Sequence, residues 1–271
     1  MKRVLIVGAN SYIGDSFAAY AKDRLEVDIV DSYDGWKTAS YENYDNVLLV
    51  AGIAHKKADK DLHFAVNHDL AINMAKRARD GGVEQFIYIS SMAVYGITQG
   101  EITHDTKPNP DTKYYYALSK FQAEEELTRI MENLCIVRPP MVYGPGCPGN
   151  FSKLVSLTRK LPIFPDIKNK RSMIFIDNLC AFLLQVIENN LAGVQMPQNK
   201  EHVNTTGLVR AIAMHQGKRI RTTRFFNPII SLLIRFVPQV WKLFGSLYYS
   251  HSDNEDMYNV VGFEESIKKT L

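Results

Sequence analysis

The fold is decided by the stretch Arg3-Val4-Leu5-Ile6-Val7-Gly8-Ala9-Asn10-Ser11-Tyr12-Ile13-Gly14. Its first half is a continuous apolar run that a glycine ends, which is the pattern of a strand buried on both faces of a parallel sheet. A helical stretch from Asp15 to Lys22 follows. Strand, glycine turn and helix in this order suit a phosphate-binding turn, because the N-terminus of the helix presents unpaired N–H groups to an anion.

Within this turn, Gly8 allows a tight bend and Gly14 allows close packing of the helix. Ser11 stands where many such turns have a middle glycine, and its hydroxyl can contact phosphate. We expect the turn to bind a dinucleotide through five of its residues: Gly8, Ser11, Tyr12, Ile13 and Gly14. The alternative is a plain strand-to-helix turn without a ligand.

The residue that follows the second strand indicates which dinucleotide cofactor the protein binds. Val27 to Val30 forms that strand, and Asp31 follows it roughly 20 residues after the glycine turn, where a carboxylate accepts hydrogen bonds from the adenosine ribose. Such a carboxylate repels a 2′-phosphate, and neither Ser32 nor Tyr33 supplies a compensating charge. We therefore expect NAD rather than NADP, bound by Asp31 and Ser32. A solvated loop aspartate is the alternative.

Further buried strands continue the α/β pattern. Only a short segment separates Asp31 from the strand Asn46 to Val50, which leaves little room for a full third strand and helix. Ala51-Gly52 ends that strand with small residues that let a cofactor approach the backbone. A helical pattern from Leu62 to Arg79 stops at Gly81-Gly82. The strand Gln85 to Ile89 leads to Ser90-Ser91 at its carboxyl end, where open parallel sheets bind ligands.

A tyrosine and a lysine share one helix face in Tyr116-Ala117-Leu118-Ser119-Lys120. Tyr116 can act as general base for an alcohol or general acid for a ketone. We expect the Lys120 ammonium to lower the pKa of the phenol and to bind a nicotinamide ribose hydroxyl. Ser91 can donate a hydrogen bond to the reacting oxygen. Each feature alone has an ordinary explanation, since this spacing arises by chance and Ser91 can be a strand-end hydroxyl.

Taken together and in this order, these features resemble the extended short-chain dehydrogenase/reductase family, the NAD-dependent sugar epimerases and dehydratases. The segments Ser90 to Gly96 and Arg138 to Pro145 add to the resemblance, which runs along almost the whole chain. It implies a Rossmann-type doubly wound parallel sheet over 1–145, with sheet contributions from later segments, and a small substrate lobe over 146–271. It assigns Ser91, Tyr116 and Lys120 to the catalytic trio.

The resemblance also implies further binding residues. Ala51, Gly52 and Asn67 match positions beside the cofactor, and Pro140 falls in the loop that flanks the nicotinamide. In the substrate lobe, Asn150 and Arg171 match residues that contact a nucleotide diphosphate, and a guanidinium suits phosphate because it can donate two parallel hydrogen bonds. Met141 stands where many members have an asparagine near the substrate. His55 is either a further pocket residue or a solvent-facing loop residue.

The resemblance implies an NAD-dependent 4-epimerase of a nucleotide-linked hexose that acts through a 4-keto intermediate, and UDP is the expected carrier. A reductase of a 4-keto-6-deoxy sugar in surface-polysaccharide synthesis is the first alternative, since it uses the same trio. A non-catalytic dinucleotide-binding protein is the second. Dehydratase activity is disfavoured, because Met92 and Ala93 replace the acidic pair that eliminates water in similar enzymes.

The composition of the chain limits the classes of binding partner that we expect. The 271 residues carry 32 basic and 29 acidic side chains without a block of like charge, which disfavours nucleic acid. Three cysteines without metal-ligand spacing indicate reduced thiols in a cytoplasmic protein, with no metal site. Residues 225–244 are rich in aliphatic and aromatic side chains, and Arg235 and Lys242 would flank an apolar face there. We expect packing within the lobe or a subunit contact there rather than a membrane contact, and the resemblance implies a homodimer.

Overall fold

The computed structural model describes residues 1–54, 58–252 and 254–271. The chain divides into two compact units, each formed by several segments. The first unit comprises 1–96, 107–140 and 179–197, and the second comprises 97–106, 141–178 and 198–271.

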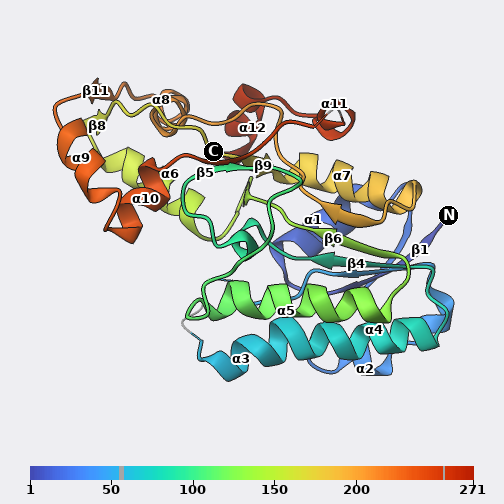
Figure 1. Cartoon of the computed structure of the whole chain (residues 1–271). Coiled ribbons are helices and arrows are strands. Elements are labelled where there is room, and N and C mark those ends of the chain that lie inside the picture. The colour runs from blue at the N-terminus through green and yellow to red at the C-terminus, as the bar shows by residue number, and fades with distance from the viewer. Residues whose placement is uncertain (55–57, 253) are drawn as a thin grey trace. The chain divides into compact units, whose positions relative to one another are not determined.

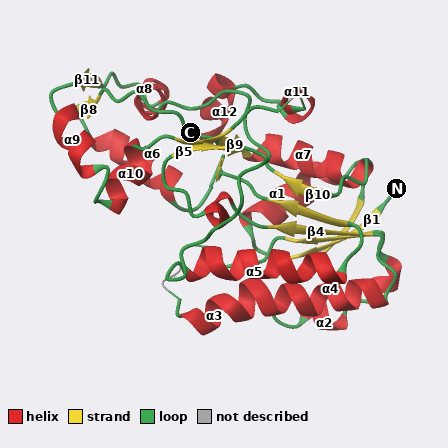
Figure 2. Ribbon diagram, viewed as in Figure 1, coloured by secondary structure: helices red, strands yellow, loops and turns green. Residues whose placement is uncertain are grey.

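The first unit is built on a six-stranded parallel sheet with the strand order β10-β6-β4-β3-β1-β2. Figure 2 shows this sheet between α4 and α5 on one face and α1 and α7 on the other. The predicted doubly wound parallel sheet is therefore confirmed. Its strands are β1 (Arg3–Val7), β2 (Glu26–Val30), β3 (Asn46–Leu49), β4 (Gln85–Ile89), β6 (Leu134–Val137) and β10 (Gly193–Gln195).

The helices of the first unit follow the apolar periodicity of the sequence. On one face, residues of α4 and α5 pack with the inner strands into a continuous core that includes Met74, Tyr88 and Leu127. The helices are α1 (Tyr12–Ala21), α2 (Gly35–Thr38), α3 (Lys60–Phe64), α4 (Leu70–Asp80), α5 (Tyr115–Ile130) and α7 (Ile176–Glu188), with a π-helical turn over Ala65–Asp69 and 3-10 turns over Tyr41–Asn43 and Met92–Tyr95.

Strand β2 lies at the edge of this sheet. The sequence predicts little room for a full third strand and helix after Asp31, and the structure agrees. Only the four-residue helix α2 and a 3-10 turn separate β2 from β3. The inner strands β3 and β4 are fully buried, whereas the side chains of β2 are all exposed or half-buried. A strand with neighbours on one side only reaches water more easily, which explains why Glu26 and Asp28 are tolerated there.

The second unit contains three small two-stranded parallel sheets. They pair β5 (Gly100–Ile102) with β12 (Leu247–Tyr249), β7 (Met141–Tyr143) with β9 (Met173–Phe175), and β8 (Ile163–Pro165) with β11 (Arg221–Thr223). Its helices, labelled in Figure 1, are α6 (Asn150–Lys160), α8 (Thr205–His215), α9 (Asn227–Leu233), α10 (Pro238–Phe244), α11 (Glu255–Tyr258) and α12 (Phe263–Thr270).

Strand pairing explains why the units interleave. The sequence predicted one boundary after residue 145, with later segments contributing to the sheet, and β10 is such a segment because it pairs with β6. Conversely, residues 97–106 come before the predicted boundary but belong to the second unit, because β5 pairs with β12. Among the described residues, no helix is long and apolar enough to cross a membrane.

Candidate active site

The turn between β1 and α1 is shaped by its glycines. Gly8 has a φ of +130°, and a Cβ on it would lie 2.8 Å from Val50 Cγ2 and 2.9 Å from the backbone nitrogen of Ala51. A Cβ on Gly14 would lie 2.6 Å from Ser11 Oγ. Glycine at both positions therefore lets the turn, the start of α1 and the end of β3 approach closely, which leaves the cradle that a dinucleotide requires.

Ser11 caps the helix that follows this turn. Its Oγ accepts a hydrogen bond of 3.1 Å from the backbone N–H of Gly14, so the hydroxyl hydrogen is directed elsewhere. Tyr12 and Ile13 form the first residues of α1 and are half-buried. The arrangement suits an anion at the N-terminus of this ten-residue helix, and the predicted cofactor contacts of Ser11, Tyr12 and Ile13 remain predictions.

Asp31 follows β2 and is exposed. Its Oδ1 accepts hydrogen bonds from the backbone N–H groups of Tyr33 at 2.7 Å and Asp34 at 2.9 Å. The N–H groups of Asp34, Tyr33 and Gly35 lower the pKa of the Asp31 carboxyl, which therefore stays ionised at neutral pH. The turn uses Oδ1, and the same ionised carboxylate is suited to a ribose diol. Ser32 beside it is half-buried.

Asn67 connects three elements around the loop after β3. Its Oδ1 accepts from the backbone N–H of Ile53 at 3.0 Å, and its Nδ2 donates to Ser119 Oγ on α5 at 3.2 Å. Its backbone carbonyl accepts from Tyr88 Oη of β4 at 2.7 Å. Asn67 lies in the π-helical turn, a type of distortion that is frequent at functional sites. The buried amide therefore fixes the position of this loop.

Gly52 lies next to Lys120, the lysine of the predicted trio. A Cβ on Gly52 would lie 3.1 Å from both Lys120 Nζ and Asn67 Oδ1. The preceding residue, Ala51, is buried. A side chain at residue 52 would therefore press on the ammonium. The small residues after β3 thus leave Lys120 in place, and their position beside a cofactor remains a prediction.

The structure brings the hydroxyls of Ser91 and Tyr116 together. Ser91 follows β4 and caps the 3-10 turn over Met92–Tyr95, where its Oγ accepts from the Ala93 N–H at 3.1 Å. Tyr116 lies in the first turn of α5. Burial raises the pKa of Tyr116 to about 12, and the hydrogen bond with Ser91 lowers it in part. Ser91 and Tyr116 can thus contact one substrate oxygen together.

Lys120 lies one turn further along α5 and is buried. Its Nζ donates to the Ile89 carbonyl at 2.9 Å and lies 4.5 Å from the centroid of the Tyr88 ring. Burial lowers the pKa of Lys120 to about 7, and the nearby Glu124 carboxylate opposes this shift. The prediction that Lys120 lowers the pKa of Tyr116 is wrong for the protein by itself, because burial dominates both groups and places the phenol pKa above its usual value.

Glu124 extends the same helix face by one more turn and was not predicted as a site residue. It is buried with Arg138, whose Nη2 lies 2.5 Å from Glu124 Oε2 and whose Nε donates to Oε1 at 3.1 Å. The Ser90 hydroxyl also donates to Oε1, and Arg138 Nη1 donates to Tyr95 Oη at 2.9 Å. The spacing of four residues that links Tyr116 to Lys120 also leads to Glu124 and could have identified it.

The buried lysine gives a pH signature. Between about pH 7 and 10.5 the unfolded chain binds a proton at Lys120 that the folded chain lacks, so the free energy of unfolding rises with pH there. We expect the wild type to gain stability relative to Lys120→Met as the pH is raised from 7 to about 9. Urea unfolding of both proteins across this range measures the difference, and parallel pH profiles would contradict it.

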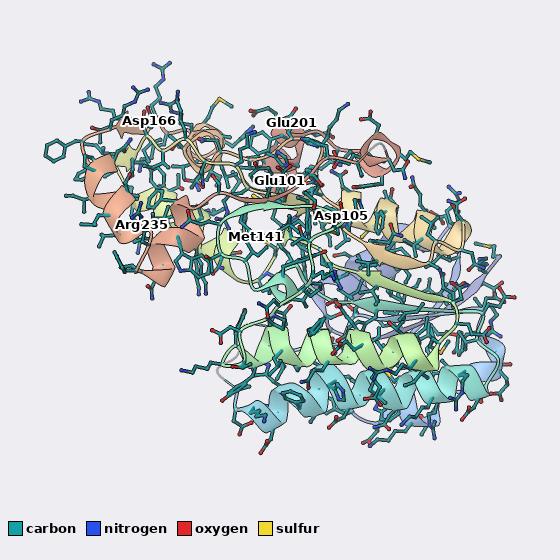
Figure 3. All side chains as sticks on the ribbon, in the orientation of Figure 1. Glu101, Asp105, Met141, Asp166, Glu201 and Arg235 are labelled. Carbon is teal, nitrogen blue, oxygen red and sulfur yellow. The ribbon has the colours of Figure 1, made fainter. Side chains whose placement is uncertain are left out.

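The remaining predicted residues are Pro140 in the first unit and three residues of the second unit. Pro140 is buried at the end of the segment 107–140. Met141, which is labelled in Figure 3, is half-buried at the start of β7, and Asn150 is exposed at the start of α6. Arg171 is half-buried, and its Nη1 donates to the Gly245 carbonyl at 3.0 Å. Burial lowers the pKa of Arg171. Their predicted contacts remain predictions, and His55 lies outside the described residues.

The comparison with known proteins covers the residues of this candidate site. The model of the NAD dependent epimerase/dehydratase family matches residues 4–204. This match covers the glycine turn, the trio and Arg171. The chain belongs to this family.

Curated relatives within the family differ in the reactions for which they are named. A UDP-glucose 4-epimerase of Vibrio cholerae is 34% identical over 224 residues, which are 76% of this chain and 64% of that protein. An N-acetyl-alpha-D-glucosaminyl-diphospho-ditrans,octacis-undecaprenol 4-epimerase of Escherichia coli O157:H7 is 26% identical, covering 69% and 59%. A UDP-2-acetamido-2,6-beta-L-arabino-hexul-4-ose reductase of Pseudomonas aeruginosa is 24% identical, covering 70% and 50%.

These coverages mean that the chain spans about half to two thirds of the length of the curated relatives it matches. Solved structures of the family match nearly end to end. A dTDP-4-dehydrorhamnose reductase of Clostridium acetobutylicum has a TM-score of 0.76 at 19% identity, with 98% of this chain and 97% of that chain covered. At this identity the likeness concerns the fold.

Proposed function

We propose that the protein is an NAD-dependent 4-epimerase of a hexose linked through a diphosphate to a carrier, with UDP as the first choice of carrier. The hydrogen-bonded pair of Ser91 and Tyr116, with Lys120 one turn along the same helix, is the observation that supports a reaction at a sugar hydroxyl. The relative of Vibrio cholerae supports the choice of C4 and of UDP.

The cofactor fits the residues of the first unit. Gly8 and Gly14 leave the close approach that a pyrophosphate needs, and α1 points its N-terminus at this turn. The ionised Asp31 carboxylate favours a ribose diol and disfavours a 2′-phosphate. NAD, when bound, supplies a hydride acceptor at the start of the reaction and a hydride donor at its end.

The side chains of the trio then have separate tasks. Ser91 donates a hydrogen bond to the C4 oxygen and holds it beside the phenol. Tyr116 removes the proton of the C4 hydroxyl during oxidation and returns it during reduction. The high pKa of Tyr116 in the free protein makes proton removal unfavourable, and the positive charge of an oxidised nicotinamide ring would favour the phenolate when NAD is bound. Lys120, held by Ile89 and Tyr88, binds the nicotinamide ribose.

A 4-keto-sugar reductase is the second candidate, because the same trio protonates a ketone oxygen and a relative is named for that reaction. The carrier of the sugar also has a second candidate, since another relative is named for a sugar on diphospho-undecaprenol. Both carriers present a diphosphate, and Arg171, whose other guanidinium nitrogens can donate to phosphate oxygens, is the residue we propose to contact it.

A substrate panel tests the proposal. UDP-hexoses, diphospho-polyprenol hexoses and UDP- and dTDP-linked 4-keto-6-deoxy sugars are assayed for isomer formation and for NADH or NADPH consumption, and the nucleotide released by denaturing the purified protein is identified. An epimerase forms the C4 isomer without net NADH consumption and releases NAD. Stoichiometric NADH or NADPH oxidation on a 4-keto sugar would replace the epimerase by the reductase. Binding of NAD without turnover of any substrate would indicate a non-catalytic protein.

A further inference from the structure

The second unit carries an apolar stripe that is open to solvent. It consists of side chains spaced three or four residues apart over the turn before α9, α9 itself and the turn after it: Phe225, Ile229, Leu232, Leu233 and Phe236. Phe225 is 79% exposed, Leu232 64% and Phe236 75%. The opposite side of α9 is the packed one, because Ile230 is buried there. The stripe therefore does not pack within the lobe, and the other expectation for this stretch, a subunit contact, stays a prediction.

The stripe is fixed to the unit at its start. Asn227 Nδ2 donates to the Asp166 carbonyl at 2.9 Å, and Arg224 Nε lies 3.2 Å from Asp166 Oδ2. Phe244 of α10 packs on Phe164 of β8, with 5.7 Å between the ring centroids. These contacts hold the two short helices in place, so the stripe is presented by an ordered element.

The segment of sequence that carries the stripe has charges of one sign. Residues 202–252, which we call the basic segment, contain no aspartate or glutamate and seven basic residues: Arg210, Lys218, Arg219, Arg221, Arg224, Arg235 and Lys242. Arg235 lies between α9 and α10 (Figure 3) and is exposed beside the stripe. The ion pair of Arg224 with Asp166 neutralises one of these charges. The segment therefore remains strongly cationic.

We propose that the apolar stripe docks on the surface of an anionic lipid bilayer. Exposed aromatic and aliphatic side chains can enter the interface between headgroups and acyl chains, while the flanking arginines and lysines remain with anionic headgroups. A second copy of the chain is a poorer occupant. Symmetric pairing of two stripes would bring the two basic segments together without an acidic residue in either to neutralise them. Among the described residues no helix is long and apolar enough to cross a bilayer, and the proposed contact is with the bilayer surface.

Vesicle sedimentation of the full chain tests the proposal. We expect binding to vesicles of phosphatidylglycerol and phosphatidylethanolamine, little binding to phosphatidylcholine vesicles, and release by added salt. The triple variant Ile229→Ser, Leu232→Ser and Phe236→Ser should bind more than about tenfold more weakly. The matched control Met214→Ser and Val260→Ser removes exposed apolar side chains of the same unit outside the stripe and should bind as the wild type does.

Two results would overturn the proposal. One is equal binding of the wild type to anionic and neutral vesicles, or none to either. The other is a lipid-independent dimer in analytical ultracentrifugation that the triple variant abolishes, since the stripe would then be a subunit contact. Circular dichroism checks that the triple variant folds. If it does not fold, the pair Arg235→Gln and Lys242→Gln serves instead, and unchanged binding of that pair to anionic vesicles would count against the proposal.

Discussion

Replacing Tyr116 by phenylalanine is expected to lower turnover by about 10²- to 10⁴-fold, because the variant lacks the only group in our scheme that transfers the C4 proton. The ring of Tyr116 remains, so the packing against Tyr114, whose centroid lies 5.8 Å away, is retained. Cofactor affinity should change little, since Lys120 and the glycine turn are untouched. Turnover on the best substrate of the panel and NAD affinity measured by calorimetry separate the two effects.

Tyr115→Phe is the matched control for this experiment. Tyr115 begins the same helix and is half-buried, but it has no role in the proposed reaction. Its loss should leave turnover near that of the wild type. Activity of Tyr116→Phe close to wild type would remove Tyr116 from the mechanism, whereas equal losses in both variants would indicate a structural defect of α5.

Breaking the Glu124–Arg138 pair is expected to have the largest effect on stability. Both side chains are buried, so Arg138→Met leaves a carboxylate without its cation and should cost about 3–5 kcal/mol. The double variant Glu124→Gln and Arg138→Met should cost clearly less than the sum of the single variants, because it removes both charges. Urea unfolding of the four proteins gives this double-mutant cycle.

An exposed pair provides the comparison. Arg24 and Glu188 lie 2.6 Å apart in the same unit but reach solvent, so Arg24→Met should cost about 1 kcal/mol or less. Additive effects at Glu124 and Arg138 would show that the two charges do not stabilise each other. The outcome also bears on the site, since Glu124 lies one helical turn from Lys120 and opposes the lowering of its pKa.

The sheet could be predicted because its strands are buried runs with clear ends. The run from Arg3 to Val7 and the strand from Gln85 to Ile89 have the bounds that the sequence predicted. The short segment after Asp31 was correctly predicted to leave too little room for a full further strand and helix between β2 and β3. The second unit was less predictable, because its strands are three residues long and pair with distant segments, as β5 does with β12. Such pairings depend on tertiary contacts that local patterns do not encode.

The site was predictable in position but not in its electrostatics. Helical spacing placed Tyr116 and Lys120 on one face, and the strand end placed Ser91 within hydrogen-bonding reach of the phenol. Spacing alone says nothing of how deeply a group is buried. Burial decides here that the phenol pKa rises and the ammonium pKa falls, contrary to the predicted effect of one charge on the other. The exposure of the apolar stripe was likewise not predicted, because solvent exposure cannot be inferred from apolar content.

The interleaving of the two units limits how the chain can be divided. Because α7 starts in the second unit and ends in the first, and β10 follows it, a fragment ending at residue 145 lacks the strand that covers β6. That fragment would present a bare sheet edge and an uncovered apolar face, both of which promote aggregation. A half-length protein carrying the complete glycine turn and trio would therefore be a poor substitute for the intact chain in cofactor-binding work.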